Sequence, residues 1–142
     1  MDVKIKRLHS NAVIPRYGSE QAAGFDFYSI EELLIMPGET VLIGTGLAFE
    51  LEVGTELQVR PRSGISVKTK IRVSNSPGTV DSDFRGEVKI ILDNIGVFPY
   101  TVKVGDRVAQ GVICPVYKAE FIIAEELDLT KRGINGMGST GI

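Results

Sequence analysis

The stretch RVAQGVICPV, residues 107–116, shows most clearly what kind of chain this is. Val108, Val112, Cys114 and Val116 recur at even positions. A period of two places such residues on one face of a β-strand. The stretch therefore predicts a strand with one buried face, and the same parity puts the polar Gln110 on that face.

Gln110 leaves two arrangements open. A buried glutamine needs hydrogen-bond partners for its amide. A β-bulge would instead turn the side chain outward. In that case Arg107 is a structural charge or a charge on the rim of a site.

The same period of two recurs along the chain. Apolar residues alternate with polar ones at Val3 and Ile5, at Leu57 and Val59, and at Phe98, Tyr100, Val102 and Val104. Turn signals containing glycine separate these stretches at 37–39, 53–55, 76–79 and 104–106. Many short strands at this spacing predict an all-β sandwich, jelly roll or barrel. One short helix is expected over 64–70, with Ser63 as its N-cap.

Composition limits the kinds of protein that fit. The 142 residues favour a single domain over 1–142. A net charge of −2 argues against a nucleic-acid coat, which is normally basic. The single cysteine, Cys114, and the single histidine, His9, leave no disulfide framework and no ordinary zinc site. We expect Cys114 in the core and His9 at the surface.

The chain also lacks membrane signals. Its first residues alternate and are charged, unlike a signal peptide. No apolar run approaches the roughly 18 residues that cross a bilayer. We expect a cytoplasmic protein that binds neither membrane nor nucleic acid.

Two segments are suited to holding an anion. In PRSGIS, 61–66, the Arg62 cation is followed by Ser63 and Gly64, whose hydroxyl and amides can point at one oxyanion. The alternative is a capped turn with a solvated arginine. The tail, 132–142, has four glycines in eleven residues, which lets an anion approach its amides closely. Without a ligand, that tail is expected to be a mobile end.

The stretch GTVDSDFRGE, 78–87, combines acids with an aromatic. We expect strand, turn and strand over 73–92, forming a hairpin whose peptide groups can face a flat ligand. Asn75 adds a donor and an acceptor that can distinguish one pyrimidine edge from another. Phe84 can lie against a sugar, and Asp81 can orient and deprotonate a water. The alternative is an ordinary surface hairpin.

Five segments appear together in the order typical of one family. They are AAGFDFYS, PRSGIS, GTVDSDFRGE, RVAQ and RGINGMGSTG, and they extend over most of the chain. On these motifs the sequence resembles the trimeric dUTP diphosphatases (dUTPases). The resemblance implies a β-clip or jelly-roll-like subunit, a homotrimer, and active sites shared between subunits.

The resemblance also implies a chemistry and a site. dUTP would be hydrolysed to dUMP and pyrophosphate by water attack on the α-phosphorus, with Asp81 as general base. The implied residues fall into three groups: Asn75, Thr79, Val80, Phe84 and Lys89 at base and sugar; Arg62, Ser63, Gly64 and Gln110 at the phosphates; and Arg132, Met137, Gly138, Ser139 and Thr140 on an arm, 130–142, that closes over the nucleotide. Asp26 would support the phosphate and magnesium region through water or by orienting its neighbours. Mg²⁺ would be held by the triphosphate and waters, without a direct protein ligand.

Two positions depart from the family pattern in a way that bears on binding. Phe84 stands where the family usually has Tyr, which keeps the flat ring and loses a hydroxyl. Met137 stands where the family usually has Phe. Methionine is polarizable but less rigid, so we expect weaker closure of the arm and a higher KM.

Two alternatives differ from this reading. A dCTP deaminase, a structural relative, needs an acid–base Glu after an Arg-Ser-Ser motif, whereas this chain has Arg62, Ser63 and Gly64. The other alternative is a nucleotide-gated regulator that uses the same trimer to bind a regulatory protein partner. The chain has no inserted domain for that role.

Overall fold

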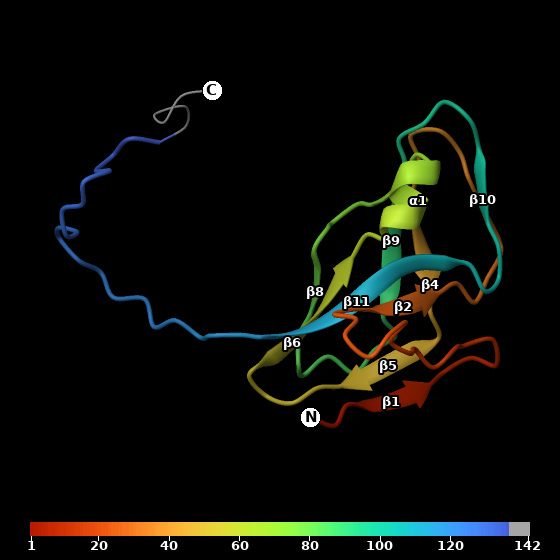
Figure 1. Ribbon diagram of the computed structural model, residues 1–142, viewed down its shortest axis with the longest axis horizontal. Helices are drawn as coiled ribbons and strands as arrows, with labels where there is room; N and C mark the ends of the chain where they lie inside the picture. Colours follow the sequence, from red (N-terminus) through yellow and green to blue (C-terminus); the bar gives the residue numbers. More distant parts are fainter. Residues whose placement is uncertain (137–142) are drawn as a thin grey trace.

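The computed structural model describes residues 1–136 and is built almost entirely of β-structure (Figure 1). Its elements are β1 (Lys4–Arg7), β2 (Phe25–Tyr28), β3 (Leu33–Ile35), β4 (Thr40–Gly44), β5 (Leu47–Glu50), β6 (Thr55–Arg60), α1 (Ser63–Lys68), β7 (Ile71–Val73), β8 (Gly78–Val80), β9 (Lys89–Asn94), β10 (Tyr100–Val102) and β11 (Arg107–Pro115). The prediction of an all-β fold with one short helix is confirmed. Within residues 1–136, no helix is long and apolar enough to cross a bilayer.

The strands form four antiparallel sheets. The largest has the order β2–β11–β6–β8, and a second has the order β4–β9–β7. Two pairs, β1–β5 and β10–β3, complete the body. β11 lies between β2 and β6 and crosses the middle of the body in Figure 1. This long strand is therefore the element that brings distant parts of the chain together.

The core lies between the sheets and is filled by the alternate residues that face inward. Phe25, Phe27 and Phe49 pack edge-on or stacked, with ring centroids 5.5–6.3 Å apart. β11 passes so close to these rings that a Cβ on Gly111 would lie 2.6 Å from Phe25 Cε2. Leu57 and Val59 are buried here, as the alternation of their strand predicts.

A β-bulge interrupts β11 near its start. Arg107 pairs with Tyr28, whereas Ala109 pairs with Phe27, so Val108 is the extra residue. Val108 is 1% exposed and points into the core beside the fully buried Ala109. The insertion shifts the parity of the strand: from Ala109 onward, odd positions face the core.

This shift overturns part of the sequence analysis. Val112 and Cys114 do not share the buried face of Val108; both are half-buried, and Val116 is exposed. Cys114 is thus not a core residue: its Sγ lies 3.6 Å from Arg60 Nη2. His9 is exposed, as expected.

Two predicted elements have different bounds. The helix occupies 63–68 rather than 64–70, and Arg62, in extended conformation, takes the N-cap position without a side-chain cap. Ser63 is thus the first helical residue. β10 is shorter than its alternation suggests, because the Asn94 side chain donates to the carbonyl of Phe98 and holds that loop outside the sheet. Phe98 is 77% exposed and Val104 is 51% exposed.

The expected hairpin over 73–92 is wrong in topology. β8 pairs with β6, and β9 pairs with β4 and β7, so the two strands belong to different sheets. We call residues 81–88, which connect them, the bridging loop. Its backbone lies between two sheets, and it is not the tip of a β-ribbon.

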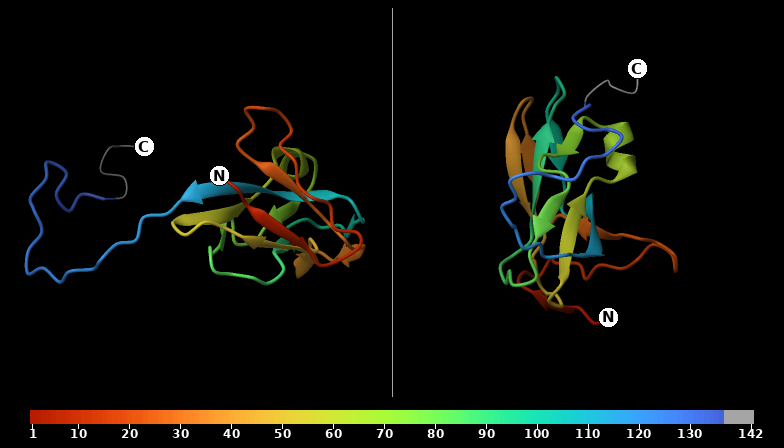
Figure 2. Two further views of the ribbon diagram at one scale, coloured as in Figure 1. Left: turned by 90° about the horizontal axis from the view of Figure 1, so that it is seen from below. Right: turned by 90° about the vertical axis from the view of Figure 1, so that its left-hand side faces the viewer.

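The chain leaves the folded body after β11. Residues 116–136 contain no strand or helix and are exposed. Figures 1 and 2 show this segment extending well away from the sheets. Below, the arm means residues 116–136, which overlap the first part of the arm expected over 130–142.

Candidate functional site

The centre of the candidate site is a row of polar side chains across the largest sheet. In this row Gln110 pairs with Asp26 on β2 and with Arg60 on β6. Its amide Nε2 donates to the carbonyl of Pro61 at 2.8 Å. A Cβ on Gly24 would lie 2.6 Å from Gln110 Oε1, so glycine leaves room for the amide. The bulge therefore puts Gln110 on the outer face, half-buried with a satisfied amide.

Asp26, Arg62 and Arg107 form a cluster at one end of this row, which we call the arginine corner. Arg62 Nε donates to Asp26 Oδ1 at 2.6 Å. Arg107 Nη1 donates to Asp26 Oδ2 at 3.4 Å. Arg62 Nη1 also donates to the main-chain carbonyl of Arg107 at 3.3 Å. One carboxylate thus orients two guanidinium groups.

Burial separates the roles of the two arginines. The side chains of Arg62 and Asp26 are 22% and 24% exposed, whereas that of Arg107 is 55% exposed. A charge-assisted hydrogen bond of this kind contributes about 1.5–3 kcal/mol when partly sheltered from water. The hydrogen bond from Arg62 to Asp26 is therefore the stronger of the two, because the bond from Arg107 is longer and more exposed to solvent.

Two hollows meet at Arg62. One, of about 600 Å³, extends from Arg62, Ser63 and Gln110 to Ser76 and Pro77. The other, of about 370 Å³, is lined by Arg62 together with Gly64, Lys68 and Arg107. Ser63 and Gly64 are exposed, and nothing lies within 4 Å of a Cβ on Gly64. A guanidinium, a hydroxyl and an open backbone therefore converge where an anion can enter.

Tyr100 also lines the second hollow. Burial, with a smaller contribution from the negative charge of Asp106, raises the pKa of the Tyr100 phenol. A raised pKa keeps the phenol neutral at physiological pH. Tyr100 therefore adds no negative charge beside the arginine corner.

The bridging loop carries the proposed base and sugar residues. The amide of Phe84 donates to the carbonyl of Asp81 at 3.1 Å, which closes a turn. Arg85 Nη1 donates to the carbonyls of Ser82 and Phe84 and ties the loop to itself. A Cβ on Gly86 would lie 2.6 Å from Phe84 Cζ, so the ring rests on the glycine. Asp81 is exposed and Phe84 is 45% exposed.

The other expected base-side residues lie near this loop. Thr79 pairs with Gln58 across β8 and β6 and is exposed, and Val80 packs against the core. Asn75 lies in the β7–β8 turn, with Nδ2 3.1 Å from a Cβ on Gly78. Lys89 is exposed at the start of β9, and its Nζ lies 3.8 Å from Glu87 Oε2.

One of the remaining candidates, Arg132, lies on the arm. Arg132 Nε donates to the carbonyl of Asn135 at 2.9 Å, within the exposed arm. Met137, Gly138, Ser139 and Thr140 lie outside the described residues. The structure thus gathers Asp26, Arg62, Ser63, Gly64 and Gln110, while Asp81 and Phe84 are presented on a separate loop.

Sequence reasoning did not find all of the residues at the site. Arg60 belongs to a ladder in which its Nε donates to Gln58 Oε1 at 2.9 Å and Gln58 Nε2 donates to Glu56 Oε1 at 2.7 Å. The alternation of β6 could have placed these three on one outward face. The pairing of Arg107 with Asp26 depends on the bulge, which the sequence pattern left open.

Metal ligands do not cluster in the part of the chain that the structure describes. Within residues 1–136, no group of three or more His, Cys, Asp or Glu side chains is placed to hold an ion.

Comparison with known proteins identifies a matching family model and relatives of this chain. The family model described as dUTPase matches residues 10–141. A deoxyuridine 5′-triphosphate nucleotidohydrolase of Nautilia profundicola is 55% identical over 141 residues, 99% of each chain. One from Helicobacter pylori (strain Shi470) is 52% identical over 142 residues, 100% of this chain and 98% of the relative.

Solved structures agree with the fold. The Staphylococcus bacteriophage 80alpha dUTPase with dUpNHpp superposes with a TM-score of 0.94 at 26% identity and covers 99% of each chain. Phage dUTPases of this kind are described as controlling transfer of virulence genes. A dUTPase variant from phage phi11 of S. aureus, described with a structural Mg(II) ion, has a TM-score of 0.86 at 24% identity, over 91% of this chain and 100% of that one.

Proposed function

The chain belongs to the dUTPase family, and from that premise we propose that it hydrolyses dUTP to dUMP and pyrophosphate. One observation supports the assignment of the arginine corner as the place where the phosphates bind. Arg62 is held by Asp26 at 2.6 Å beside the open backbone of Ser63 and Gly64. Phosphoryl transfer depends mainly on positioning and on neutralising charge, and this corner supplies both.

Arg62 remains able to bind an anion while it is held. A guanidinium has five N–H donors. Among the described residues, one N–H donates to Asp26 and one to the carbonyl of Arg107. Three donors remain for phosphate oxygens. The half-buried Gln110 and the hydroxyl of Ser63 extend the cradle along the same hollow.

Asp81 is the proposed general base. Its carboxylate is exposed on the bridging loop, where it can orient a water and accept its proton as the water attacks the α-phosphorus. General-base catalysis of this kind contributes roughly 10²–10⁴-fold. Phe84, resting on Gly86, offers a flat face for the deoxyribose. Thr79 and Val80 directly precede the loop and Lys89 directly follows it, and Asn75 in the β7–β8 turn completes the proposed base and sugar side.

Mg²⁺ is the proposed cofactor. Mg²⁺ prefers oxygen ligands and keeps several waters, and it is commonly held by substrate phosphates with few protein ligands. Both carboxylate oxygens of Asp26 already accept from arginines, which favours orientation of its neighbours over direct ligation. When bound, the ion neutralises triphosphate charge, and the donors of this chain position the phosphates around it.

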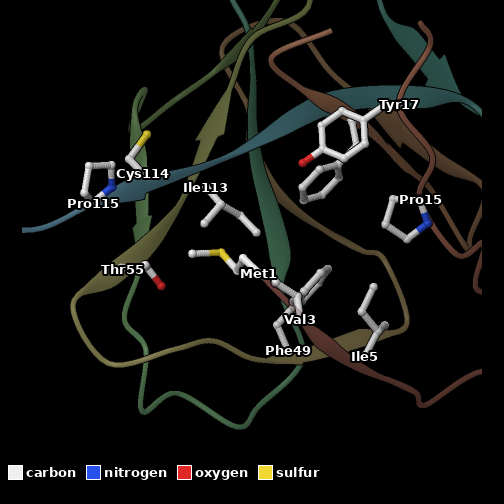
Figure 3. A pocket seen from close by; sticks show the side chains of 11 residues that line it. Met1, Val3, Ile5, Pro15, Tyr17, Phe49, Thr55, Ile113, Cys114 and Pro115 are labelled. Atoms are coloured by element: carbon white, nitrogen blue, oxygen red, sulfur yellow. The ribbon is translucent and has the colours of Figure 1, made fainter. Parts of the chain in front are cut away.

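We propose a homotrimer with shared sites. The arm exposes Phe121, Ile123 and Leu129 at 95–100%. An apolar groove of about 440 Å³ lies beside the edge strand β1, and Figure 3 shows Val3, Phe49 and Ile113 among the side chains that line it. Large apolar side chains seldom stay fully exposed in number on a soluble monomer. An apolar arm and an apolar groove on each copy allow neighbouring copies to cover one another.

Shared sites would also explain why the bridging loop and the arginine corner lie apart within one chain. Asp81 and Phe84 are not among the residues lining the hollow at Arg62 and Gln110. In a trimer, the bridging loop of one copy can face the arginine corner of another. The last residues, with Arg132 and the stretch from Met137 to Thr140, would then close over the nucleotide and exclude water.

The decisive experiment compares four nucleotides. We expect the purified protein to release pyrophosphate from dUTP with Mg²⁺ and to leave dCTP, dTTP and UTP almost untouched. Equal hydrolysis of all four would contradict the proposal. Ammonia released from dCTP would indicate a deaminase instead.

A second role can coexist with catalysis. The description of phage relatives as controlling transfer of virulence genes favours a nucleotide-gated regulator as the alternative. The test is capture of a protein partner with and without a non-hydrolysable dUTP analogue. Capture that does not depend on nucleotide would contradict the regulator role.

A further inference from the structure

We propose that Arg107 is a positioning residue that keeps the charge of Arg62 available to phosphate by sharing the carboxylate of Asp26. This inference rests on the proposed function of the arginine corner and assigns a role that the sequence motifs left open.

The bulge decides which residue faces Asp26. Asp26 pairs with Gln110 and Phe27 with Ala109. In an uninterrupted antiparallel ladder, Tyr28 would then face Val108, and paired residues point to the same side of a sheet. Because Val108 is the extra residue, Arg107 faces Tyr28 instead and joins the outer face of Asp26. One inserted residue thus buries an apolar side chain and places a cation on the site.

Charge is the main consequence. Asp26 carries one negative charge, and Arg62 and Arg107 carry one positive charge each, so the corner has a net charge of +1. If Asp26 paired with Arg62 alone, the net charge would be zero. A triphosphate would then meet a neutralised arginine. Because Arg107 takes up part of the negative charge of Asp26, Arg62 keeps more of its positive charge toward an incoming phosphate, at a place where Arg62 is only 22% exposed and poorly screened by water.

Geometry adds to this effect. Arg107 Nη1 holds Asp26 Oδ2, which leaves Oδ1 directed at Arg62 Nε. The main-chain carbonyl of Arg107 accepts from Arg62 Nη1. A guanidinium fixed at two of its nitrogens pays less entropy when its other donors meet phosphate.

The test uses substitutions that separate these contributions. Arg107→Met keeps an aliphatic stem and the main-chain carbonyl but removes the charge. Arg107→Lys keeps the charge and loses the planar fork. Lys103→Ala, an exposed cation on the preceding turn, is the matched control. The thermal midpoint of each variant shows whether the fold is kept.

Binding is measured by calorimetry with Mg²⁺ and three probes: inorganic tripolyphosphate, a non-hydrolysable dUTP analogue, and dUMP. Arg107→Met should weaken tripolyphosphate and the analogue about tenfold, the range expected for a partly exposed charged contact. Arg107→Lys should weaken them about threefold or less. Binding of dUMP should change little, because its base and sugar lie against the bridging loop.

A double-mutant cycle with Asp26→Asn decides whether Arg107 acts through Asp26. If it does, Arg107→Met adds less than about twofold in the Asp26→Asn background, since coupled residues are not additive. A full tenfold loss in that background would overturn the inference, because Arg107 would then act on the phosphate directly. Wild-type binding in Arg107→Met, equal losses for dUMP, or no binding of tripolyphosphate by the wild type would also overturn it.

Failure of the inference is distinguishable from failure of the proposed function. The tripolyphosphate cycle requires no hydrolysis. If the wild type hydrolyses dUTP but the cycle is additive, the function stands and the role of Arg107 is wrong. If the wild type hydrolyses no dUTP while the cycle is coupled, the proposed function is wrong and the positioning role stands.

Discussion

The arginine corner and the bridging loop are close to the same sheet, yet they are organised in different ways. In the corner, both oxygens of Asp26 already have partners, and beside it Gln110 Nε2 donates to the carbonyl of Pro61. On the bridging loop, Asp81 and Phe84 are exposed. The corner is therefore preorganised within one chain, whereas the loop presents both side chains to solvent. Preorganised charge is effective because it costs no rearrangement when the phosphates arrive.

The largest expected effect comes from removing the proposed base. Asp81→Asn should lower kcat about 10²–10⁴-fold, because the amide cannot take a proton from water. Affinity for the dUTP analogue should remain close to that of the wild type, since the corner is untouched. Pyrophosphate release measures kcat, and calorimetry measures the affinity for the analogue. Asp83→Asn, two residues along the loop, is the matched control. Full activity in Asp81→Asn would show that the loop supplies no base.

Substitutions on the arm test whether the bridging loop needs a neighbouring copy of the chain to complete the site. Phe121→Ser with Ile123→Ser replaces two side chains that are 95% and 100% exposed within one chain. If another copy buries them, their loss should weaken the assembly by about 3 kcal/mol or more. Light scattering after size exclusion should then show single chains at dilution, together with lost activity.

Lys118→Ser, an exposed polar position on the arm, is the control for that experiment. A double variant that keeps the mass and activity of the wild type would mean that the arm takes no part in assembly. The contacts that hold neighbouring copies together would then lie elsewhere on the folded body.

A smaller effect is expected where the ring of Phe84 rests on Gly86. In Gly86→Ala, the new Cβ would lie 2.6 Å from Phe84 Cζ, so the ring has to move. Because the ring is 45% exposed, it can swing outward, and the cost to stability should be about 1 kcal/mol or less. The Kd for dUMP should rise about threefold, in line with roughly 0.7 kcal/mol of lost contact. Gly18→Ala, where the space is also open, should not affect dUMP. An unchanged Kd in Gly86→Ala would mean that Phe84 does not touch the ligand.

The smallest effect concerns Tyr100 beside the corner. Its pKa is raised by burial and by Asp106, so as pH rises the unfolded chain loses this proton first. Stability from this group is therefore complete below about pH 10 and declines above it. Tyr100→Phe should remove that decline, by less than about 0.5 kcal/mol. Urea unfolding at pH 8 and pH 10.5 measures it, with Tyr117→Phe on the arm as control. A steeper decline in Tyr100→Phe would contradict the assigned direction.

How far the sequence predicts the molecule depends on the range of the interactions involved. Alternation at Leu57 and Val59 correctly predicted a strand with a buried face, because side-chain direction along a strand is a local property. The turns at Gly38, Gly54 and Gly105 were also predicted, and each has positive φ, where glycine carries no steric cost. By contrast, the expected hairpin over 73–92 was wrong. The local pattern predicted a strand, a turn and a strand there, but partners far along the chain determine the sheet to which each strand belongs.

The sequence by itself determined the all-β class, the short helix near Ser63 and the residue types suited to holding a phosphate, since each follows from nearest neighbours along the chain. Only the tertiary structure decided that Val108 is an extra residue, that Arg107 meets Asp26, and that Cys114 is not in the core. The reason is that a bulge is defined by two strands together: β11 has no register until β2 lies against it, and one inserted residue reverses the facing of every residue beyond it.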